Sequence, residues 1–189
     1  MPKIIVISGT PGTGKTLVAK KLAEKLKACY INLSDMVINE KLYVEYDEVR
    51  KSYVIDEEKV KTRLREIAKS CDILIVDGHY GELAPRELVD KIIVLRTDPL
   101  ELEKRLRKKG WSWEKIKENV AAEIIGVCTV NALEEHGEGK VYEIDTTNRS
   151  PEEIIEEIIN EVLSGKAVSG PRIDWLTLKP LEVLKKYLD

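Results

Sequence analysis

The sequence predicts an α/β fold with helices around a parallel sheet, and three observations predict it. Short apolar runs of strand length recur along the 189 residues, stretches with helical spacing of apolar residues separate them, and a glycine-rich loop joins the first strand to the first helix. The candidate strands are residues 3–8, 30–33, 72–77, 91–96 and 141–145. Apolar strands that alternate with helices indicate β–α–β units and therefore a parallel sheet. Ligands of such sheets bind beyond the carboxyl ends of the strands.

The candidate helices carry apolar residues three and four positions apart. They are residues 17–27, 59–69, 99–109, 113–135, 151–163 and 180–188. The helix over 113–135 is expected to break or bend near residues 126–129. Ser150 and Pro151 predict where the following helix begins, because serine is favoured at the N-cap and proline at the first helical position.

The glycine-rich loop, residues 9–16 (GTPGTGKT), fits the pattern G-x-x-x-x-G-K-[ST] of the phosphate-binding P-loop. Its glycines allow backbone N–H groups to surround phosphate oxygens, and the positive end of the following helix faces the same anion. Lys15 is expected to reach the β- and γ-phosphates of ATP, and the Thr16 hydroxyl to bind Mg²⁺. A chance glycine-rich turn is the alternative, but a strand before the loop and a helix after it favour a P-loop NTPase. The expected ATP-binding residues of the motif are Gly9, Gly12, Thr13, Gly14, Lys15 and Thr16.

A second part of the site is expected where the apolar run 73–77 ends in Asp77. An acid at this position is typical of the Walker B residue, which holds Mg²⁺ through water. His79 follows, and a loop histidine beside a metal acid could position a water or bond the γ-phosphate; a structural hydrogen bond is the alternative. Lys15, Asp77 and His79 are therefore the candidate catalytic residues, with Thr16 and Asp77 approaching the metal. His136, which follows a helix end, is expected at the surface.

Phosphoryl transfer also needs positive charge around the transferred group. Basic residues gather just before Gly110, at Arg105, Arg107, Lys108 and Lys109. Arg105 and Lys109 are four residues apart and share a helix face, so they could reach phosphates or stack on a base. A solvated basic surface explains the same cluster.

The amino-acid composition limits the classes of protein to which the chain can belong. Hydrophobic residues make up 43% of the chain, and no run approaches the ~20 apolar residues of a membrane span. The net charge of −3 gives no general sign of nucleic-acid binding. Cys29, Cys71 and Cys128 form no C-x-x-C pair, so buried free thiols in a reducing compartment are expected rather than disulfides or a zinc site. We therefore expect a soluble, cytoplasmic protein, and the 34% of charged residues suits a thermophilic source.

Three segments do not fit the simple alternation of strands and helices. Residues 34–56 are polar and contain three tyrosines, and residues 111–117 separate two helices; long excursions of this kind are often functional lids. The tail, residues 165–189, begins with a Gly/Ser/Pro-containing linker. We expect its helix to dock on the core, with binding of a partner as the alternative.

Together these features resemble the nucleoside monophosphate kinases. More narrowly, the chain is similar to the adenylate kinase isoenzyme 6 family, also called coilin-interacting nuclear ATPase, with its archaeal adenylate kinases. The similarity covers residues 3 to about 164. It is carried by the P-loop, Tyr30-Ile31-Asn32 with Asp35, Glu40 with Leu42-Tyr43, Tyr46-Asp47, Val76-Asp77 with His79, Val94-Leu95-Arg96-Thr97-Asp98, Arg105-Leu106, Gly110, Asn119 and Glu123.

The resemblance implies a five-stranded parallel sheet in a domain over residues 1–164, with a monophosphate-binding insert near 30–53 and a lid near 108–118. It implies ATP-dependent phosphorylation of AMP, an ATPase activity, and a role in maturing the small ribosomal subunit with a small-subunit ribosomal protein as partner. Leu17, Arg105 and Lys109 join the P-loop as implied ATP-binding residues. Residues 146–149 are implied to meet the adenine through their backbone, although a lead-in to the next helix explains them equally well.

The chain departs from the family pattern at two positions. Ile38 stands where the family often has an arginine that would grip the monophosphate, so Arg50 or Lys51 would have to serve. Lys109 stands where an arginine that touches ATP is usual, and lysine keeps the charge without the planar fork. These departures leave two further hypotheses open: a ribosome-assembly ATPase with little kinase activity, and a kinase for another small acceptor. A GTPase is disfavoured because the chain has no N-K-x-D motif.

Overall fold

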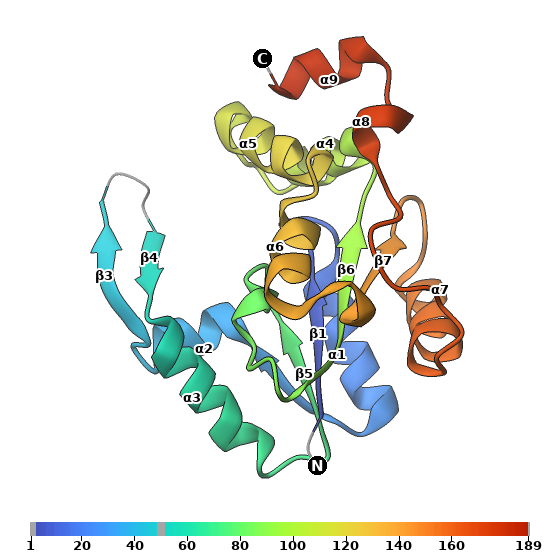
Figure 1. The fold of residues 1–189 in the computed structure, drawn as a ribbon. Coiled ribbons are helices and arrows are strands. Elements are labelled where there is room, and N and C mark those ends of the chain that lie inside the picture. Colours follow the sequence, from blue (N-terminus) through green and yellow to red (C-terminus); the bar gives the residue numbers. More distant parts are fainter. Residues whose placement is uncertain (1–2, 49–51, 189) are drawn as a thin grey trace.

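A computed structural model of the chain describes residues 3–48 and 52–188. Five parallel strands form its central sheet (Figure 1). Their order is β2 (Cys29–Asn32), β5 (Ile73–Asp77), β1 (Lys3–Ser8), β6 (Val89–Arg96) and β7 (Val141–Asp145). The five strands and their parallel direction confirm the prediction, with bounds that differ by at most two residues.

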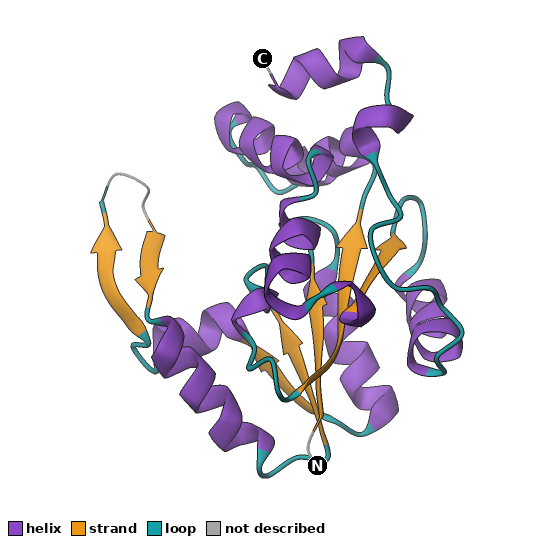
Figure 2. Cartoon of the chain, in the orientation of Figure 1, coloured by secondary structure: helices purple, strands orange, loops and turns teal. Residues whose placement is uncertain are grey.

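Helices cover both faces of the sheet (Figure 2). On one face, α1 (Lys15–Leu26) and α7 (Pro151–Glu157), which continues as a π-helical segment over Ile158–Leu163, pack on alternate strand residues such as Ile5 and Ile7. On the other face, α2 (Leu33–Asn39), α3 (Glu57–Ala68) and α6 (Val127–His136) pack on the intervening residues, such as Ile4 and Val6. Because both faces are covered, the central strands are apolar over most of their length.

A third apolar cluster lies beyond the carboxyl edge of the sheet (Figure 1). It joins α4 (Pro99–Lys108) and α5 (Trp113–Ile124) to two helices of the tail, α8 (Trp175–Leu178) and α9 (Leu181–Leu188). Trp175 and Tyr187 are the tail's buried members of this cluster. The tail helix therefore forms where it was expected, and it packs on α5.

Two predicted helix boundaries agree with the structure. The helix expected over 113–135 breaks after Ile124, where Gly126 has a φ of 69° and α6 begins at Val127. Ser150 caps α7 by accepting a hydrogen bond from the Glu153 N–H, while the Glu153 side chain returns to the Ser150 N–H as a capping box.

The insert after β2 contains a hairpin that the sequence did not predict. Strands β3 (Tyr43–Asp47) and β4 (Ser52–Ile55) pair antiparallel and stand apart from the main sheet (Figure 1). Tyr53 packs against two partners on this hairpin, with ring centroids 4.4 Å from Tyr43 and 5.0 Å from Tyr46. Arg50 and Lys51, expected as alternatives to the missing arginine, lie outside the described residues.

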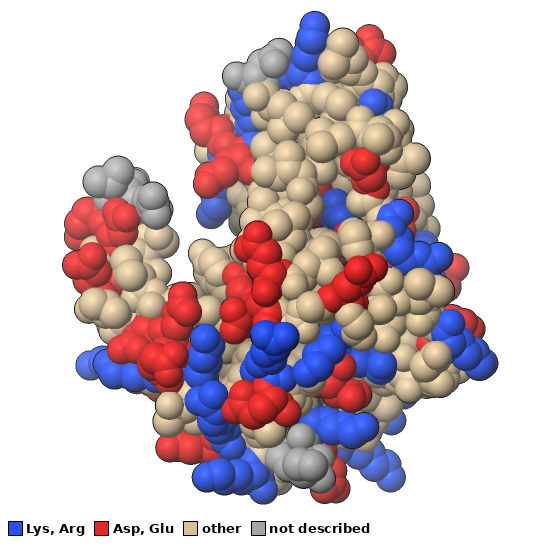
Figure 3. All heavy atoms as spheres, in the orientation of Figure 1, with Lys and Arg blue, Asp and Glu red and all other residues tan. Residues whose placement is uncertain are grey.

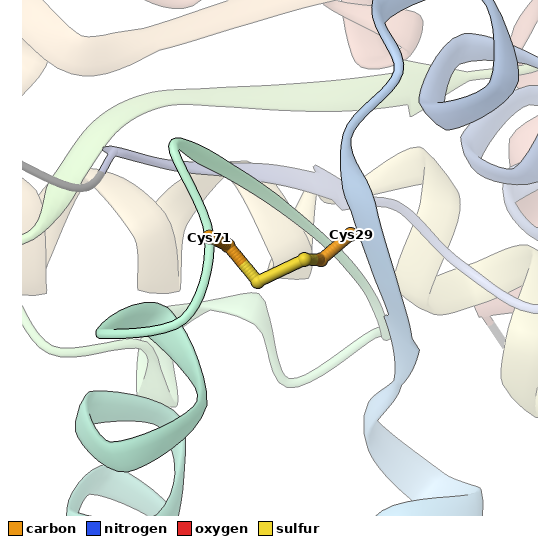
Figure 4. The surroundings of a disulfide bond; sticks show 2 residues. All are labelled: Cys29 and Cys71. Carbon is orange, nitrogen blue, oxygen red and sulfur yellow. A yellow bond between two sulfur atoms is a disulfide. The ribbon is translucent and has the colours of Figure 1, made fainter.

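The cysteine prediction is wrong for two of the three residues. Cys29 and Cys71 form a disulfide, with Cα atoms 6.1 Å apart (Figure 4). Parallel pairing of β2 with β5 aligns Cys29 with Leu74, and this register brings the turn before β5 beside the start of β2. The two cysteines are 42 residues apart in sequence and become neighbours only when the sheet forms, so the sequence did not predict their bond. Cys128 is a buried free thiol, as expected.

The prediction for His136 is also wrong, because this residue is buried at the end of α6. Its Nε2 lies 3.0 Å from the Glu82 carbonyl oxygen, and burial lowers the pKa of the imidazole. Contact between α6 and the 3₁₀ turn Gly81–Leu83 covers the helix end that the sequence placed in solvent.

The surface carries charges of both signs. Figure 3 shows Lys and Arg interspersed with Asp and Glu on the face it presents, in keeping with the net charge of −3. Among residues 3–48 and 52–188, no helix is both long and apolar enough to cross a membrane.

Candidate nucleotide-binding site

The P-loop runs from the carboxyl end of β1 to the start of α1 and depends on glycine at two close contacts. Gly9 has a φ of 135°, and a Cβ there would lie 2.4 Å from the Leu95 carbonyl oxygen. Gly12 has a φ of 97°, and a Cβ would lie 2.8 Å from Leu102 Cδ1. The loop is therefore packed against β6 on one side and α4 on the other, and larger residues would push it out of place.

Lys15 is the first residue of α1, and its side chain contacts the loop before it. Its Nζ donates to the Thr10 carbonyl oxygen over 3.1 Å, and Thr13 Oγ1 donates to the same oxygen over 2.9 Å. Burial lowers the pKa of the Lys15 ammonium; the positive charge of Lys109 acts in the same direction, and the carboxylate of Asp77 opposes them. A part-buried ammonium held by a backbone carbonyl can exchange that oxygen for one of a phosphate.

Asp77 is buried at the carboxyl end of β5 and gathers three side-chain donors. Its Oδ2 accepts hydrogen bonds from Thr16 Oγ1 at 2.7 Å, Asn32 Nδ2 at 2.9 Å and Tyr30 OH at 3.1 Å. Burial first, and then the charge of Asp77, raise the pKa of the Tyr30 hydroxyl to about 12, so this group remains a donor. Thr16 and Asp77 therefore lie side by side, although they are 61 residues apart in sequence.

These oxygen atoms fit Mg²⁺ bound together with a nucleotide. Mg²⁺ prefers oxygen ligands and usually takes one or two from the protein, with water and substrate phosphates supplying the others. Within the described ranges, no group of three or more His, Cys, Asp or Glu side chains could hold a metal ion. The Thr16–Asp77 pair suits an ion that arrives with its phosphates rather than one caged by protein.

His79 lies two residues beyond Asp77 and faces the same region. Burial, and then the charge of Lys15, lower the pKa of the imidazole to about 4. The ring is therefore neutral near pH 7 and offers one donor and one acceptor. It stacks on Tyr80 with ring centroids 3.9 Å apart, and the His79 carbonyl accepts a long contact of 3.8 Å from Cys128 Sγ. Burial raises the pKa of the Cys128 thiol to about 11, so this cysteine is not a nucleophile at neutral pH.

The other predicted ATP-binding residues are Arg105, Lys109 and Leu17. Arg105 on α4 donates to the Thr146 carbonyl oxygen over 3.0 Å and pairs with Glu101, so it joins α4 to the loop after β7. Lys109 caps the end of α4, and its charge reaches Lys15. Leu17 is half exposed on α1. Arg107 instead pairs with Glu103 and lies over the Trp113 ring.

A cavity of about 200 Å³ opens beside His79, between α2 and the hairpin. Its lining is mostly apolar and aromatic: Leu33, Ser34, Val37, Ile38, Ser52, Tyr53, Ile55, His79 and Tyr80. The predicted insert thus supplies one wall and the loop after β5 the other. The cavity adjoins the Asp77 end of the sheet through His79 and Tyr80.

Sequence comparisons place the chain among known proteins. Residues 5–126 match a family model described as "AAA domain". A protein of Saccharolobus islandicus (strain L.S.2.15 / Lassen #1) named "Putative adenylate kinase" is 43% identical over 186 residues, which cover 98% of this chain and 94% of that protein. A protein of the same name from Methanocaldococcus jannaschii is 43% identical over 90% of this chain and 92% of its own. The chain belongs to this archaeal adenylate kinase family.

Membership of the archaeal adenylate kinase family extends further along the chain than the sequence pattern indicated. We expected the resemblance to end near residue 164, but an alignment that covers 98% of the chain must reach well into residues 165–189. The tail is therefore a shared part of the S. islandicus relative and this chain, not an addition to this chain alone.

Solved structures agree on the fold. A shikimate kinase from Bacteroides thetaiotaomicron superposes with a TM-score of 0.57 at 20% identity, over 86% of this chain and 98% of that one. A gluconokinase from Sinorhizobium meliloti 1021 gives a TM-score of 0.54 at 16% identity, over 86% and 93%. At these identities the comparison shows the fold alone, and it confirms the predicted P-loop NTPase class for this adenylate kinase family member.

Some residues at the site were not predicted as parts of it. Tyr30 and Asn32 donate to Asp77 from the strand that pairs with β5, and Asn32 could have been found because it ends that strand. Glu123 accepts a hydrogen bond of 2.6 Å from Thr10 Oγ1 in the P-loop. Nothing in its local sequence predicted this contact, since 113 residues separate the two.

Proposed function

We propose that this protein is an ATP-dependent nucleoside monophosphate kinase that converts ATP and AMP into two molecules of ADP. The observation that supports it best is the meeting of two halves at one sheet edge. Lys15 and the Thr16–Asp77 pair form a phosphate- and metal-binding half, and the His79 cavity forms an acceptor half beside it. The name of the archaeal relatives points to the same reaction.

The proposed reaction assigns a role to each residue. An oxygen of the AMP phosphate attacks the γ-phosphorus of ATP, the bond from that phosphorus to the β–γ bridging oxygen breaks, and the second ADP leaves. Lys15 and the backbone of residues 9–16 hold the phosphates, with Thr16 and Asp77 on the side of the Mg²⁺ that accompanies ATP. His79, which is neutral, holds the transferred group or the attacking oxygen by a hydrogen bond. Arg105, Lys109 and Leu17 complete the ATP side.

The acceptor half is assigned to the insert near residues 30–53. Tyr53 and Tyr80 expose part of their rings at the cavity, where an adenine can stack. Ile38 lines the same cavity in place of the expected arginine, so the monophosphate must be gripped by other residues. Closure of the insert and of the segment near residues 108–118 would exclude water, which otherwise takes the phosphoryl group.

A second candidate function is an ATPase that acts as a switch in the assembly of the small ribosomal subunit, with a small-subunit ribosomal protein as partner. The observation in its favour is the missing arginine at Ile38, which weakens the case for a tightly held monophosphate. His79 would then orient a water toward the γ-phosphate. Either function is proposed to operate in the cytoplasm.

The test is steady-state ADP formation by the purified chain with Mg·ATP alone and with AMP, CMP, UMP or GMP. The kinase proposal predicts a large increase with AMP that disappears in Lys15→Ala. Slow hydrolysis that no monophosphate accelerates would reject it in favour of the ATPase. Acceleration by a different acceptor would keep the kinase chemistry and reject AMP as substrate.

A further inference from the structure

A cluster of buried charges lies between the tail and the P-loop. Arg96 of β6, Glu123 of α5 and Glu143 of β7 are each no more than 7% exposed. Arg96 Nε donates to Glu123 Oε1 over 2.8 Å, and Arg96 Nη1 donates to the Glu143 carboxylate. One cation thus faces two carboxylates. Buried charges are costly unless they are fully hydrogen-bonded, so this cluster needs further donors.

The tail supplies those donors. The backbone N–H groups of Arg172 and Ile173 donate to Glu143 Oε2 over 2.6 and 2.7 Å. The Trp175 indole Nε1 donates to Glu123 Oε1 over 3.1 Å, and the Ile173 carbonyl accepts from Arg96 Nη1 over 3.1 Å. Residues 172–175 therefore bond to all three buried charges. If the tail left, these three charged groups would lose those hydrogen-bond partners.

The same cluster reaches the P-loop on its other side. Glu123 Oε2 accepts a hydrogen bond of 2.6 Å from the buried Thr10 hydroxyl. The carbonyl of Thr10 in turn accepts from Lys15 Nζ and from Thr13 Oγ1. One carboxylate thus has Trp175 of the tail on one oxygen and the P-loop on the other, and the peptide that it fixes holds the phosphate-binding lysine.

We propose that Glu123 is a positioning residue for the P-loop and that residues 172–175 of the tail act through it. Docking of the tail holds the Glu123 carboxylate, Glu123 holds Thr10, and Thr10 keeps Lys15 and Thr13 where ATP phosphates bind. The tail is then a remote part of the nucleotide site. This inference rests on the proposed function only in taking ATP as the ligand of the P-loop.

The test compares three small changes in the full chain. Trp175→Phe keeps most of the ring and removes the N–H, Thr10→Val removes the hydroxyl at nearly constant shape, and Tyr187→Phe is the matched control. Tyr187 OH donates to Glu103 from the same docked tail, so its loss removes a buried tail hydrogen bond outside the Glu123 cluster. Calorimetric titration with Mg·ATP gives each dissociation constant at a temperature where circular dichroism shows every variant folded.

Trp175→Phe and Thr10→Val are each expected to weaken ATP binding roughly 3- to 10-fold, because each removes a hydrogen bond to a buried carboxylate. The double variant is expected to lose little more than the worse single variant, since both act on one connected chain. Thr10→Ser, which restores a hydroxyl, should recover most of the affinity that Thr10→Val loses. Tyr187→Phe should lower the melting temperature while ATP binds as in the native chain.

The inference is overturned if Trp175→Phe binds ATP as tightly as the native chain, or if the losses in the double variant multiply. It is also overturned if Tyr187→Phe weakens ATP binding as much as Trp175→Phe does, because the tail would then act only by being docked. The titration needs no acceptor. A chain with coupled ATP affinities but no transfer to AMP would uphold the inference and reject the proposed kinase, and AMP phosphorylation with unaltered affinities in the variants would do the reverse.

Discussion

Asp77 accepts hydrogen bonds from side chains of α1 and β2, and its substitution tests the proposed metal side directly. Asp77→Asn removes the negative charge of the carboxylate that accepts from Thr16, Tyr30 and Asn32. We expect kcat to fall on the order of 10- to 100-fold, as for other changes around metal ligands, together with loss of the preference for Mg·ATP over free ATP. Asp72→Asn, an exposed acid just before the same strand, is the control. Native turnover in Asp77→Asn would remove this residue from the site.

His79 predicts a pH dependence of stability. Its pKa is about 4 in the folded chain against an ordinary value of 6.5, so the unfolded chain binds the proton more readily. The neutral His79 ring therefore contributes at most about 3 kcal/mol to the free energy of unfolding. This contribution is fully present above pH ~6.5 and is lost as the pH falls toward ~4. Urea titrations of the native chain and of His79→Gln between pH 7 and pH 4.5 measure it. The variant should show the flatter decline, and parallel declines would contradict the assigned pKa.

The P-loop residues and Asp77 could be predicted because each follows from a local pattern: a motif, or the end of an apolar strand. Asn32 could have been predicted by the same rule, because it ends β2. Glu123 and Trp175 were not, because their functional neighbours come from distant segments that meet only after the sheet and the tail have packed.

The disulfide closes the base of the insert. It joins the start of β2 to the turn before β5 (Figure 4). The two cysteines are 42 residues apart in sequence, and α2, the hairpin and α3 lie in the loop between them. Restricting an unfolded loop of this length is worth about 4 kcal/mol in the chain-entropy model. We expect reductant to lower the melting temperature markedly, while Cys29→Ser/Cys71→Ser melts like the reduced chain with or without reductant.

ATP affinity should survive reduction, because Cys29 begins β2 whereas the P-loop site lies at the opposite, carboxyl ends of the strands. A melting temperature that does not respond to reductant would show that the bond does not form in solution. Disulfides inside cells are mainly found in hyperthermophiles, so a stabilising bond here would agree with the charge-rich composition.

Substitution of Ile38 on helix α2 tests the proposed acceptor cavity. Ile38 lines the cavity and is 48% exposed, so an arginine there has room to turn toward a bound monophosphate. Ile38→Arg is expected to lower the KM for AMP several-fold through a charge-assisted hydrogen bond, with the KM for ATP unchanged. Val44→Arg adds the same charge to the hairpin outside the cavity lining and should leave both constants as they are. Equal effects of the two variants would show only a general electrostatic attraction.

The five strands and most helices of the core were predicted closely, because burial on both faces of a strand or on one stripe of a helix produces a clear apolar pattern. The short helix α2 was missed, because it lies in a segment that was read as a polar insert. The hairpin β3–β4 was missed because most of its side chains are exposed or half exposed, so no alternation of apolar and polar residues identifies it. Its aromatic cluster around Tyr53 is stabilised by contacts across the hairpin instead.

The molecule as a whole joins two sites of different origin. The proposed ATP side is built on the central sheet and is joined to the tail through buried charges. The proposed acceptor side is built on the insert, which a disulfide closes at its base. The fold class, the five strands and the order of the motifs follow from the sequence. The disulfide and the buried hydrogen bonds that join these parts do not, because no local pattern shows which cysteines or charged residues become neighbours.

The most direct test of the central claim follows the γ-phosphate of labelled ATP in the presence of AMP and Mg²⁺. The two halves of the site are proposed to deliver this group to an acceptor and not to water. We predict that most of the label appears in ADP and little in inorganic phosphate, and that Lys15→Ala abolishes both. Label found almost entirely in inorganic phosphate, at a rate that AMP does not change, would contradict the account.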